Sequence, residues 1–82
     1  MKKAKEILKN LNLRPTLQRL AITEMLIKKK EVHVTAYALE KMLLKSKVYI
    51  SRATIYNNLN ELSSKGFLKK VIVNKDKMWF DT

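Results

Sequence analysis

The chain has 82 residues, a formal net charge of +11 and 46% apolar residues. This length fits one small domain, and the apolar share excludes a disordered basic tail. The absence of cysteine excludes disulfides, a thiol nucleophile and cysteine-ligated zinc or iron–sulfur sites. No run of about 18 apolar residues and no secretory segment is present, so we expect a cytoplasmic protein with no membrane partner.

The positive charge favours a polyanionic partner. Eighteen Lys and Arg residues stand against seven Asp and Glu, and a folded domain of this kind most often binds nucleic acid, and less often a membrane surface. Only three of the eighteen are arginine. A lysine-rich composition also arises in AT-biased genomes, so charge alone does not decide the function.

The first half of the chain predicts two helices. Residues 2–10 carry apolar side chains at helical spacing. Pro15 restricts the preceding residue to extended geometry, so the chain turns there. Thr16 is the expected N-cap of a second helix over about 17–29. The predicted buried stripe of that helix consists of Leu17, Leu20, Ala21, Met25 and Ile27.

Two more helices are predicted in the second half. They cover about 36–46 and 52–65, with Thr35 and Ser51 as their N-caps. Gly66 follows the last helix at the position where a left-handed residue commonly ends a helix. These signals give four helices in a single domain over residues 1–82.

After the fourth helix the apolar period changes to that of strands. Residues 67–73 and 78–82 are rich in β-branched and aromatic side chains, and polar residues 74–77 separate them. This pattern predicts a β-hairpin with a four-residue loop, and residues 31–34 read as a short extended link. The expected fold is mainly α with a small β-hairpin, a winged helix-turn-helix with an extra N-terminal helix.

The fourth helix carries the functional prediction. At 100° per residue, Ile55, Leu59 and Leu62 share one face and form a buried stripe. The opposite flank carries Asn57 and Asn60 rather than the usual Glu and Lys. Asn can donate to and accept from an adenine edge in the major groove. We interpret this flank as a DNA reader; a surface helix under weak selection is the alternative.

Other polar residues would hold the DNA backbone or enter the minor groove, while Tyr56 would touch a base. The predicted DNA-binding set is Arg14, Gln18, Arg19, Ser51, Arg52, Thr54, Tyr56, Asn57, Asn60, Lys69, Lys75 and Lys77. The hairpin lysines would equally well protect a strand edge from pairing. Arg14 would equally well be a solvated surface residue.

Several motifs resemble the ferric uptake regulator (Fur) superfamily. They are "LRPTLQR" at 13–19, "HVTA" at 33–36, "ISRATIYNNL" at 50–59, "KGFL" at 65–68 and "FDT" at 80–82. The resemblance covers the chain from about Leu13 to Thr82 and is greatest to iron-response regulators (Irr) and peroxide regulators (PerR). It implies the N-terminal winged-helix DNA-binding domain of a bacterial metal- or haem-responsive transcriptional regulator, such as a repressor.

The resemblance also implies roles for single residues. Tyr56 falls on a base-contacting position and Arg14 on a minor-groove position. Asn57 stands where many members carry Arg, so we expect an A·T-rich operator in double-stranded DNA. His33 and Asp81 fall on positions that ligate a regulatory divalent metal (iron, zinc or manganese) in full-length members. Taken on its own, a lone His before a helix is more often structural.

The family's C-terminal sensing and dimerisation domain is absent from the chain. We therefore expect an excised domain, and a naturally short protein that lost its sensor is the alternative. By itself the domain should be mostly monomeric and bind no cofactor. The full-length protein would form a homodimer through the missing part, and haem is an alternative cofactor for it. No paired carboxylates, Gly-rich phosphate loop or catalytic triad appears, so we expect no enzyme activity. A winged helix that binds protein or RNA without preference for duplex sequence remains the alternative function.

Overall fold

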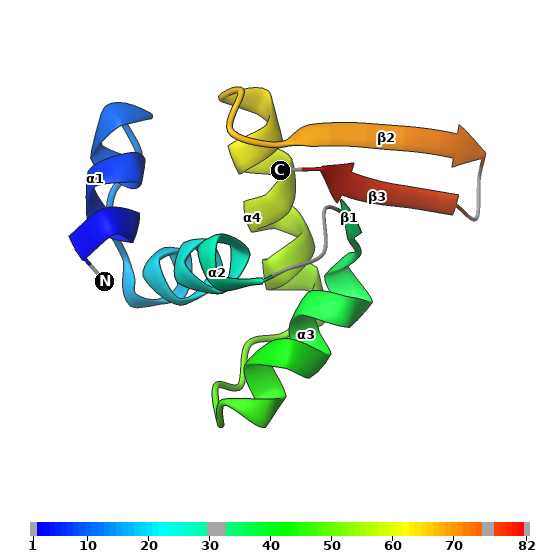
Figure 1. Ribbon diagram of the computed structural model, residues 1–82, viewed down its shortest axis with the longest axis horizontal. Helices are drawn as coiled ribbons and strands as arrows, with labels where there is room; N and C mark the ends of the chain where they lie inside the picture. Colours follow the sequence, from blue (N-terminus) through cyan, green and yellow to red (C-terminus); the bar gives the residue numbers. More distant parts are fainter. Residues whose placement is uncertain (1, 30–32, 75–76, 82) are drawn as a thin grey trace.

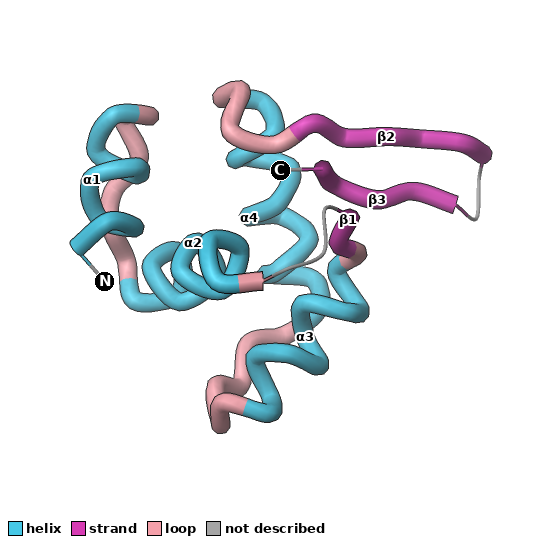
Figure 2. The backbone as a smooth tube through the Cα atoms, viewed as in Figure 1, coloured by secondary structure: helices cyan, strands magenta, loops and turns pink. Residues whose placement is uncertain are grey.

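The computed structural model describes residues 2–29, 33–74 and 77–81. In chain order the elements are α1 (Lys2–Asn10), α2 (Leu17–Lys28), β1 (His33–Val34), α3 (Ala36–Lys45), α4 (Arg52–Ser64), β2 (Lys69–Asn74) and β3 (Lys77–Asp81). Figures 1 and 2 show the helices grouped around α4, with the small sheet extending to one side. The predicted mainly α fold with a hairpin wing is confirmed, and each helix ends within about one residue of its predicted end.

The sheet has one more strand than the predicted hairpin. β1 pairs antiparallel with β3, which places β3 between β1 and β2. The register sets His33 opposite Asp81 and Val34 opposite Phe80. Because β3 is flanked on both sides, Phe80 is fully buried at the base of the wing. The segment before α3 is therefore tied to the wing, which the sequence pattern did not indicate.

The buried side of α4 is the centre of the core. Ile55 and Leu59 are fully buried and Leu62 is 3% exposed, which confirms the predicted stripe. They share one apolar cluster with side chains from every other helix and from β3, notably Leu8, Ile22, Leu39, Leu43 and Phe80. Packing from several sides fixes the rotation of α4 and determines which of its flanks meets solvent.

The predicted stripe of α2 is wrong at its first residue. Leu17 is 83% exposed, whereas Ile22 and Leu26 are the deeply buried apolar residues of this helix. Because α2 contacts α1, α3 and α4, its buried surface is wider than one stripe and includes Ile22 and Leu26, whereas Leu17 is the first residue of the helix. No helix in the described part of the chain is long and apolar enough to cross a bilayer.

Three helices end with the same backbone motif. Asn12, Lys47 and Gly66 follow α1, α3 and α4 and have φ of 60°, 61° and 87°. In each case the amide of the next residue donates back to the helix, as in Val48 N to Leu43 O at 2.9 Å. This is a Schellman ending, which satisfies carbonyls that the helix leaves free. Only Gly66 was identified from sequence, because glycine is the residue that adopts this φ without steric cost.

The Lys47→Gly variant should be more stable than the wild type. A lysine at positive φ costs about 1–2 kcal/mol that glycine does not, although glycine also gains entropy in the unfolded chain. We expect a net gain of about 0.5–1 kcal/mol in the free energy of unfolding, measured by urea denaturation. Lys41→Gly, in the middle of α3, is the matched control and should lose about 0.5–1 kcal/mol of stability. Equal effects of the two substitutions would contradict this account.

Candidate nucleic-acid interface

The start of α4 is a capped helix end with no acidic residue in its first turn. The Ser51 hydroxyl accepts a hydrogen bond from Thr54 N at 3.2 Å and donates one to Thr54 Oγ1 at 2.9 Å. A helix end of this kind carries backbone N–H groups and partial positive charge, both favourable to phosphate. The predicted contacts Ser51 and Thr54 thus lie together at the positive end of the helix.

Arg52 is held beside this helix end by residues of α3. Its Nε donates to Glu40 Oε1 at 2.9 Å, and its guanidinium lies 4.8 Å from the centroid of the Tyr37 ring. Lys41 Nζ approaches the same ring at 5.3 Å. The side chain of Arg52 remains 57% exposed, so its outer face can still meet an anion while Glu40 fixes its direction.

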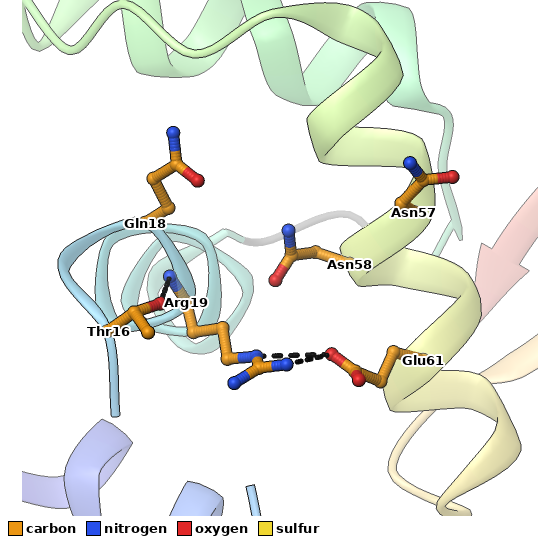
Figure 3. Close-up of a pocket in the computed structure, with 6 residues that line it drawn as sticks. All are labelled: Thr16, Gln18, Arg19, Asn57, Asn58 and Glu61. Carbon is orange, nitrogen blue, oxygen red and sulfur yellow. Dashed lines mark hydrogen bonds and ion pairs between the residues drawn. The ribbon is translucent and has the colours of Figure 1, made fainter. Parts of the chain in front are cut away.

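The asparagines of α4 lie in different surroundings. Asn57 is exposed, and no side-chain hydrogen bond of Asn57 occurs within the described ranges. Asn58 instead donates from Nδ2 to the Thr54 carbonyl at 2.9 Å, and Figure 3 shows its side chain extending toward α2. Asn60 is half-buried. Asn57 is therefore the amide on α4 that can offer both its donor and its acceptor to a base.

Tyr56 is half-buried between α4 and the wing. Its hydroxyl donates to Met78 Sδ at 3.9 Å and accepts from Lys70 Nζ at 3.4 Å. Its ring meets Phe80 edge to face, with centroids 6.4 Å apart. Hydrogen bonding with the Asn60 side chain, and then with the Lys70 ammonium, lowers the pKa of Tyr56 below its ordinary value. The hydroxyl thus faces the wing, and the ring lies at the junction of α4 and the sheet.

A polar cleft of about 400 Å³ separates α2 from α4. Side chains from both helices line it, as Figure 3 shows: Thr16, Gln18, Arg19, Asn57, Asn58 and Glu61. Gln18 is exposed at this cleft, beside the first turn of α2. Sequence reasoning did not single out Asn58 and Glu61, although Glu61 is the one acidic residue of α4 and was therefore a visible signal.

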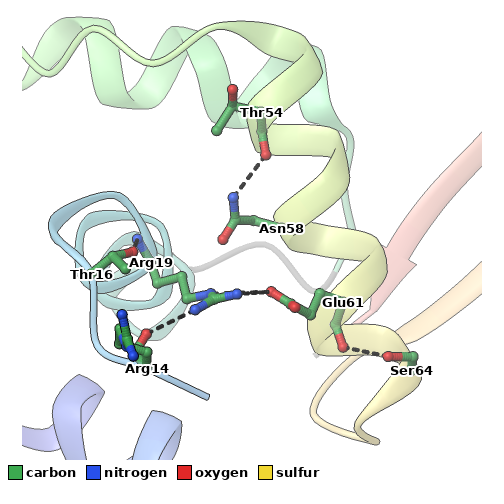
Figure 4. A network of polar contacts seen from close by, with 7 residues as sticks. All are labelled: Arg14, Thr16, Arg19, Thr54, Asn58, Glu61 and Ser64. Atoms are coloured by element: carbon green, nitrogen blue, oxygen red, sulfur yellow. Dashed lines mark hydrogen bonds and ion pairs between the residues drawn. The ribbon is translucent and has the colours of Figure 1, made fainter.

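Arg19 bridges this cleft. Its Nε and Nη2 donate to Glu61 Oε1 at 3.1 and 2.8 Å, and its Nη1 donates to the Arg14 carbonyl at 3.1 Å. Figure 4 shows this network joining the turn before α2 to α4. The predicted phosphate contact through Arg19 would compete with these bonds. The Arg14 side chain itself is exposed in the turn.

The wing presents lysines from two strands. Lys69 and Lys77 are exposed, and the backbone N–H of Lys77 donates to Asn74 Oδ1 at 3.0 Å. Lys75, the third predicted wing contact, lies outside the described residues. Lys69 stands opposite Asp81 in the β2–β3 register. Lys69 and Lys77 thus lie at the two ends of the hairpin, one near α4 and one near the tip.

His33 and Asp81 are brought together by the sheet. His33 Nδ1 and Asp81 Oδ1 are in direct contact across the β1–β3 pair, and the His33 ring lies 5.0 Å from Trp79. An imidazole nitrogen and a carboxylate oxygen suit a divalent cation. The residues described by the structure contain no group of three His, Cys, Asp or Glu that could hold a metal. The pair therefore fits part of a ligand set only.

The sequence matches the Ferric uptake regulator family over residues 10–82. No curated protein sequence matches the chain significantly. Among solved structures, the ferric uptake regulator of Pseudomonas aeruginosa with manganese superposes with a TM-score of 0.89 at 23% identity, covering 95% of this chain and 58% of that one. At this identity the likeness shows the fold alone.

Two further solved structures are more similar in sequence. The Vibrio cholerae ferric uptake regulator, described for rearrangement of its DNA-binding domains, is 31% identical with a TM-score of 0.85, covering 94% of this chain and 59% of that one. PerR from Streptococcus pyogenes, described for peroxide sensing and gene regulation, is 32% identical with a TM-score of 0.72, covering 93% and 52%. The chain thus spans a little more than half the length of these relatives.

The environment of Tyr56 gives a titration prediction. Asn60→Ala should raise the pKa of Tyr56 toward the ordinary tyrosine value, and Lys70→Met should raise it as well, because each removes a cause of the lowering. An ultraviolet titration of tyrosinate, with Tyr56→Phe used to assign the signal, measures this shift. Since the folded pKa is lowered, the wild type should gain stability relative to Tyr56→Phe as pH rises through the folded pKa toward the unfolded one. If the pKa of Tyr56 stays unchanged in both Asn60→Ala and Lys70→Met, its hydroxyl does not make these two hydrogen bonds.

Proposed function

Because the chain belongs to the ferric uptake regulator family, we propose that this domain binds double-stranded DNA selectively, with α4 in the major groove and the wing along the backbone. The exposed amide of Asn57 is the observation that supports the proposal most directly. It stands on the flank of α4 that faces away from Ile55 and Leu59, which are fully buried. A side chain in this place can donate to and accept from an adenine edge.

For the remaining predicted DNA contacts, the place of each residue in the fold suggests which part of the duplex it would meet. Ser51, Thr54 and the outer face of Arg52 lie at the first turn of α4, where phosphate is favoured. Gln18 faces the same cleft as Asn57. Lys69 and Lys77 add positive charge on the wing, and Arg14 reaches outward from the turn before α2 toward a minor groove. The side chain of Asn60 hydrogen-bonds to Tyr56, so its proposed role is to orient Tyr56 rather than to touch DNA itself.

Transcriptional regulation in response to a metal is proposed for the whole protein. His33 Nδ1 and the Asp81 carboxylate would supply two ligands to a divalent ion, which would cross-link β1 and β3 at the base of the wing. Further ligands and the homodimer contacts would come from outside the residues described. A dimer would present two copies of α4 to two half-sites, which raises affinity through effective concentration.

The test compares duplexes of different composition across a salt series. The wild type should prefer an A·T-rich duplex selected from a random library over a G·C-rich duplex and over duplex RNA. Asn57→Ala should lose about 1–3 kcal/mol of this discrimination. Asn58→Ala is the matched control, because its amide is already bonded to the Thr54 carbonyl, and it should keep the preference. Equal affinity of the wild type for all duplexes and for RNA would contradict the proposal.

A wing substitution should act differently. Lys69→Ala should weaken binding to every duplex alike, because Lys69 is exposed on the backbone-facing wing and would bind phosphate rather than a base. The slope of log affinity against log salt should become less steep by about 0.9 for each phosphate that the protein no longer neutralises. Fluorescence anisotropy at several salt concentrations measures both quantities. An unchanged salt slope would show that Lys69 binds no phosphate and only keeps the edge strand from pairing with another strand.

A further inference from the structure

The Arg19 guanidinium joins three parts of the fold. All three of its nitrogens are engaged, Nε and Nη2 by Glu61 Oε1 and Nη1 by the Arg14 carbonyl. Arg19 and Glu61 are 42 residues apart in sequence. The two side chains are 25% and 36% exposed, so the pair is only partly screened by solvent. The network thus links the turn before α2, α2 itself and α4 through one side chain (Figure 4).

The Arg14 end of this network is held twice. The Arg14 carbonyl accepts from Thr16 N at 2.9 Å and from Arg19 Nη1 at 3.1 Å. Pro15 follows Arg14 and restricts its backbone to extended geometry. The backbone from which the exposed Arg14 side chain projects is therefore fixed relative to the first turn of α2, which Thr16 caps.

The Glu61 end of the network joins α4 to α2. Glu61 lies one helical turn after Asn57, on a part of α4 that faces α2 across the cleft of about 400 Å³. Apolar packing leaves this cleft open, so the polar bridge is what spans it. A partly exposed ion pair adds little to overall stability. A planar guanidinium that binds at three points is better suited to fixing a distance and an angle.

We propose that Arg19 is a positioning residue for DNA recognition. Through Glu61 and the Arg14 carbonyl, it holds the turn that carries Arg14 and the helix that carries Asn57 at one spacing. The minor-groove and major-groove contacts can then engage the same duplex together. This inference rests on the proposed DNA binding, and it replaces the predicted phosphate contact of Arg19 with an indirect role.

The test uses a duplex selected by the wild type from a random library, together with two altered versions of it. One alters the bases read in the major groove, and the other replaces the flanking A·T step with G·C. Arg19→Gln and Glu61→Gln should each reduce the preference for the selected duplex over both altered versions by about tenfold, which corresponds to about 1.4 kcal/mol. The salt slope should stay that of the wild type. The exchanged pair Arg19→Glu with Glu61→Arg should recover the preference for the bases read in the major groove but not the preference for the flanking A·T step, because a carboxylate at position 19 cannot donate to the Arg14 carbonyl.

Matched controls separate this effect from charge and folding. Lys28→Gln removes a positive charge from an exposed ion pair on α2, and Glu6→Gln removes a negative charge from the exposed side of α1. Both should keep the wild-type preference. Arg19→Lys keeps the charge but loses the planar fork, so it should behave like Arg19→Gln. Circular dichroism confirms that each variant used is folded.

Two results would overturn the inference. In the first, Arg19→Gln weakens binding to all duplexes equally and makes the salt slope less steep by about 0.9, while Glu61→Gln has no effect. Arg19 would then bind phosphate directly. If both single variants bind and discriminate as the wild type does, the bridge has no role in recognition.

A measurement without DNA keeps this inference separate from the proposed function. Glu61→Gln should shift the amide NMR signals of Arg14 and Thr16, because without the ion pair to α4 the Arg19 guanidinium is no longer held in place against the Arg14 carbonyl. Unshifted signals would overturn the bridge itself. If the wild type shows no preference for any duplex while these signals do shift, the proposed DNA reading fails and the bridge between the turn and α4 stands.

Discussion

The burial of one face of α4 is the constraint on which the rest of the structure depends. Ile55 and Leu59 are fully buried, together with Phe80 from the wing and Leu39 and Leu43 from α3. Because packing reaches this face from several sides, α4 has no freedom to rotate about its axis. The opposite flank is then presented to solvent in a fixed direction. A helix that reads base edges needs this fixed direction, since a rotation of one residue would replace Asn57 with Asn58 or Tyr56.

The polar contacts divide the basic residues into two groups. Arg19 and Arg52 are each engaged by a glutamate, Glu61 and Glu40, and both pairs join α4 to a neighbouring helix. The exposed lysines, such as Lys69 and Lys77, are outside these networks. Arginine offers a planar fork and lysine a flexible point charge. In this chain two of the three arginines therefore link α4 to neighbouring helices, while these exposed lysines face solvent.

The base of the wing brings together groups that are far apart in the chain. β1 places His33 against Asp81, and the same sheet presents Lys70 and Met78 to the hydroxyl of Tyr56. A shift of β3 relative to β1 would thus change the surroundings of the Tyr56 side chain, which lies at the junction of α4 and the sheet. The β1–β3 pair and the Tyr56 hydroxyl are thus connected through the same three-stranded sheet.

The sequence by itself determined the local features: the four helices, the caps Thr16, Thr35 and Ser51, the hairpin, and the buried stripe of α4. These depend on periodicity and on hydrogen bonds between residues a few positions apart. It did not determine that Leu17 is exposed, that β1 joins the sheet, or that Asn58 turns inward while Asn57 does not. Nor did it indicate the Arg19–Glu61 pair. Those outcomes depend on how the helices pack, and partners 42 residues apart meet only when the tertiary structure brings α2 beside α4.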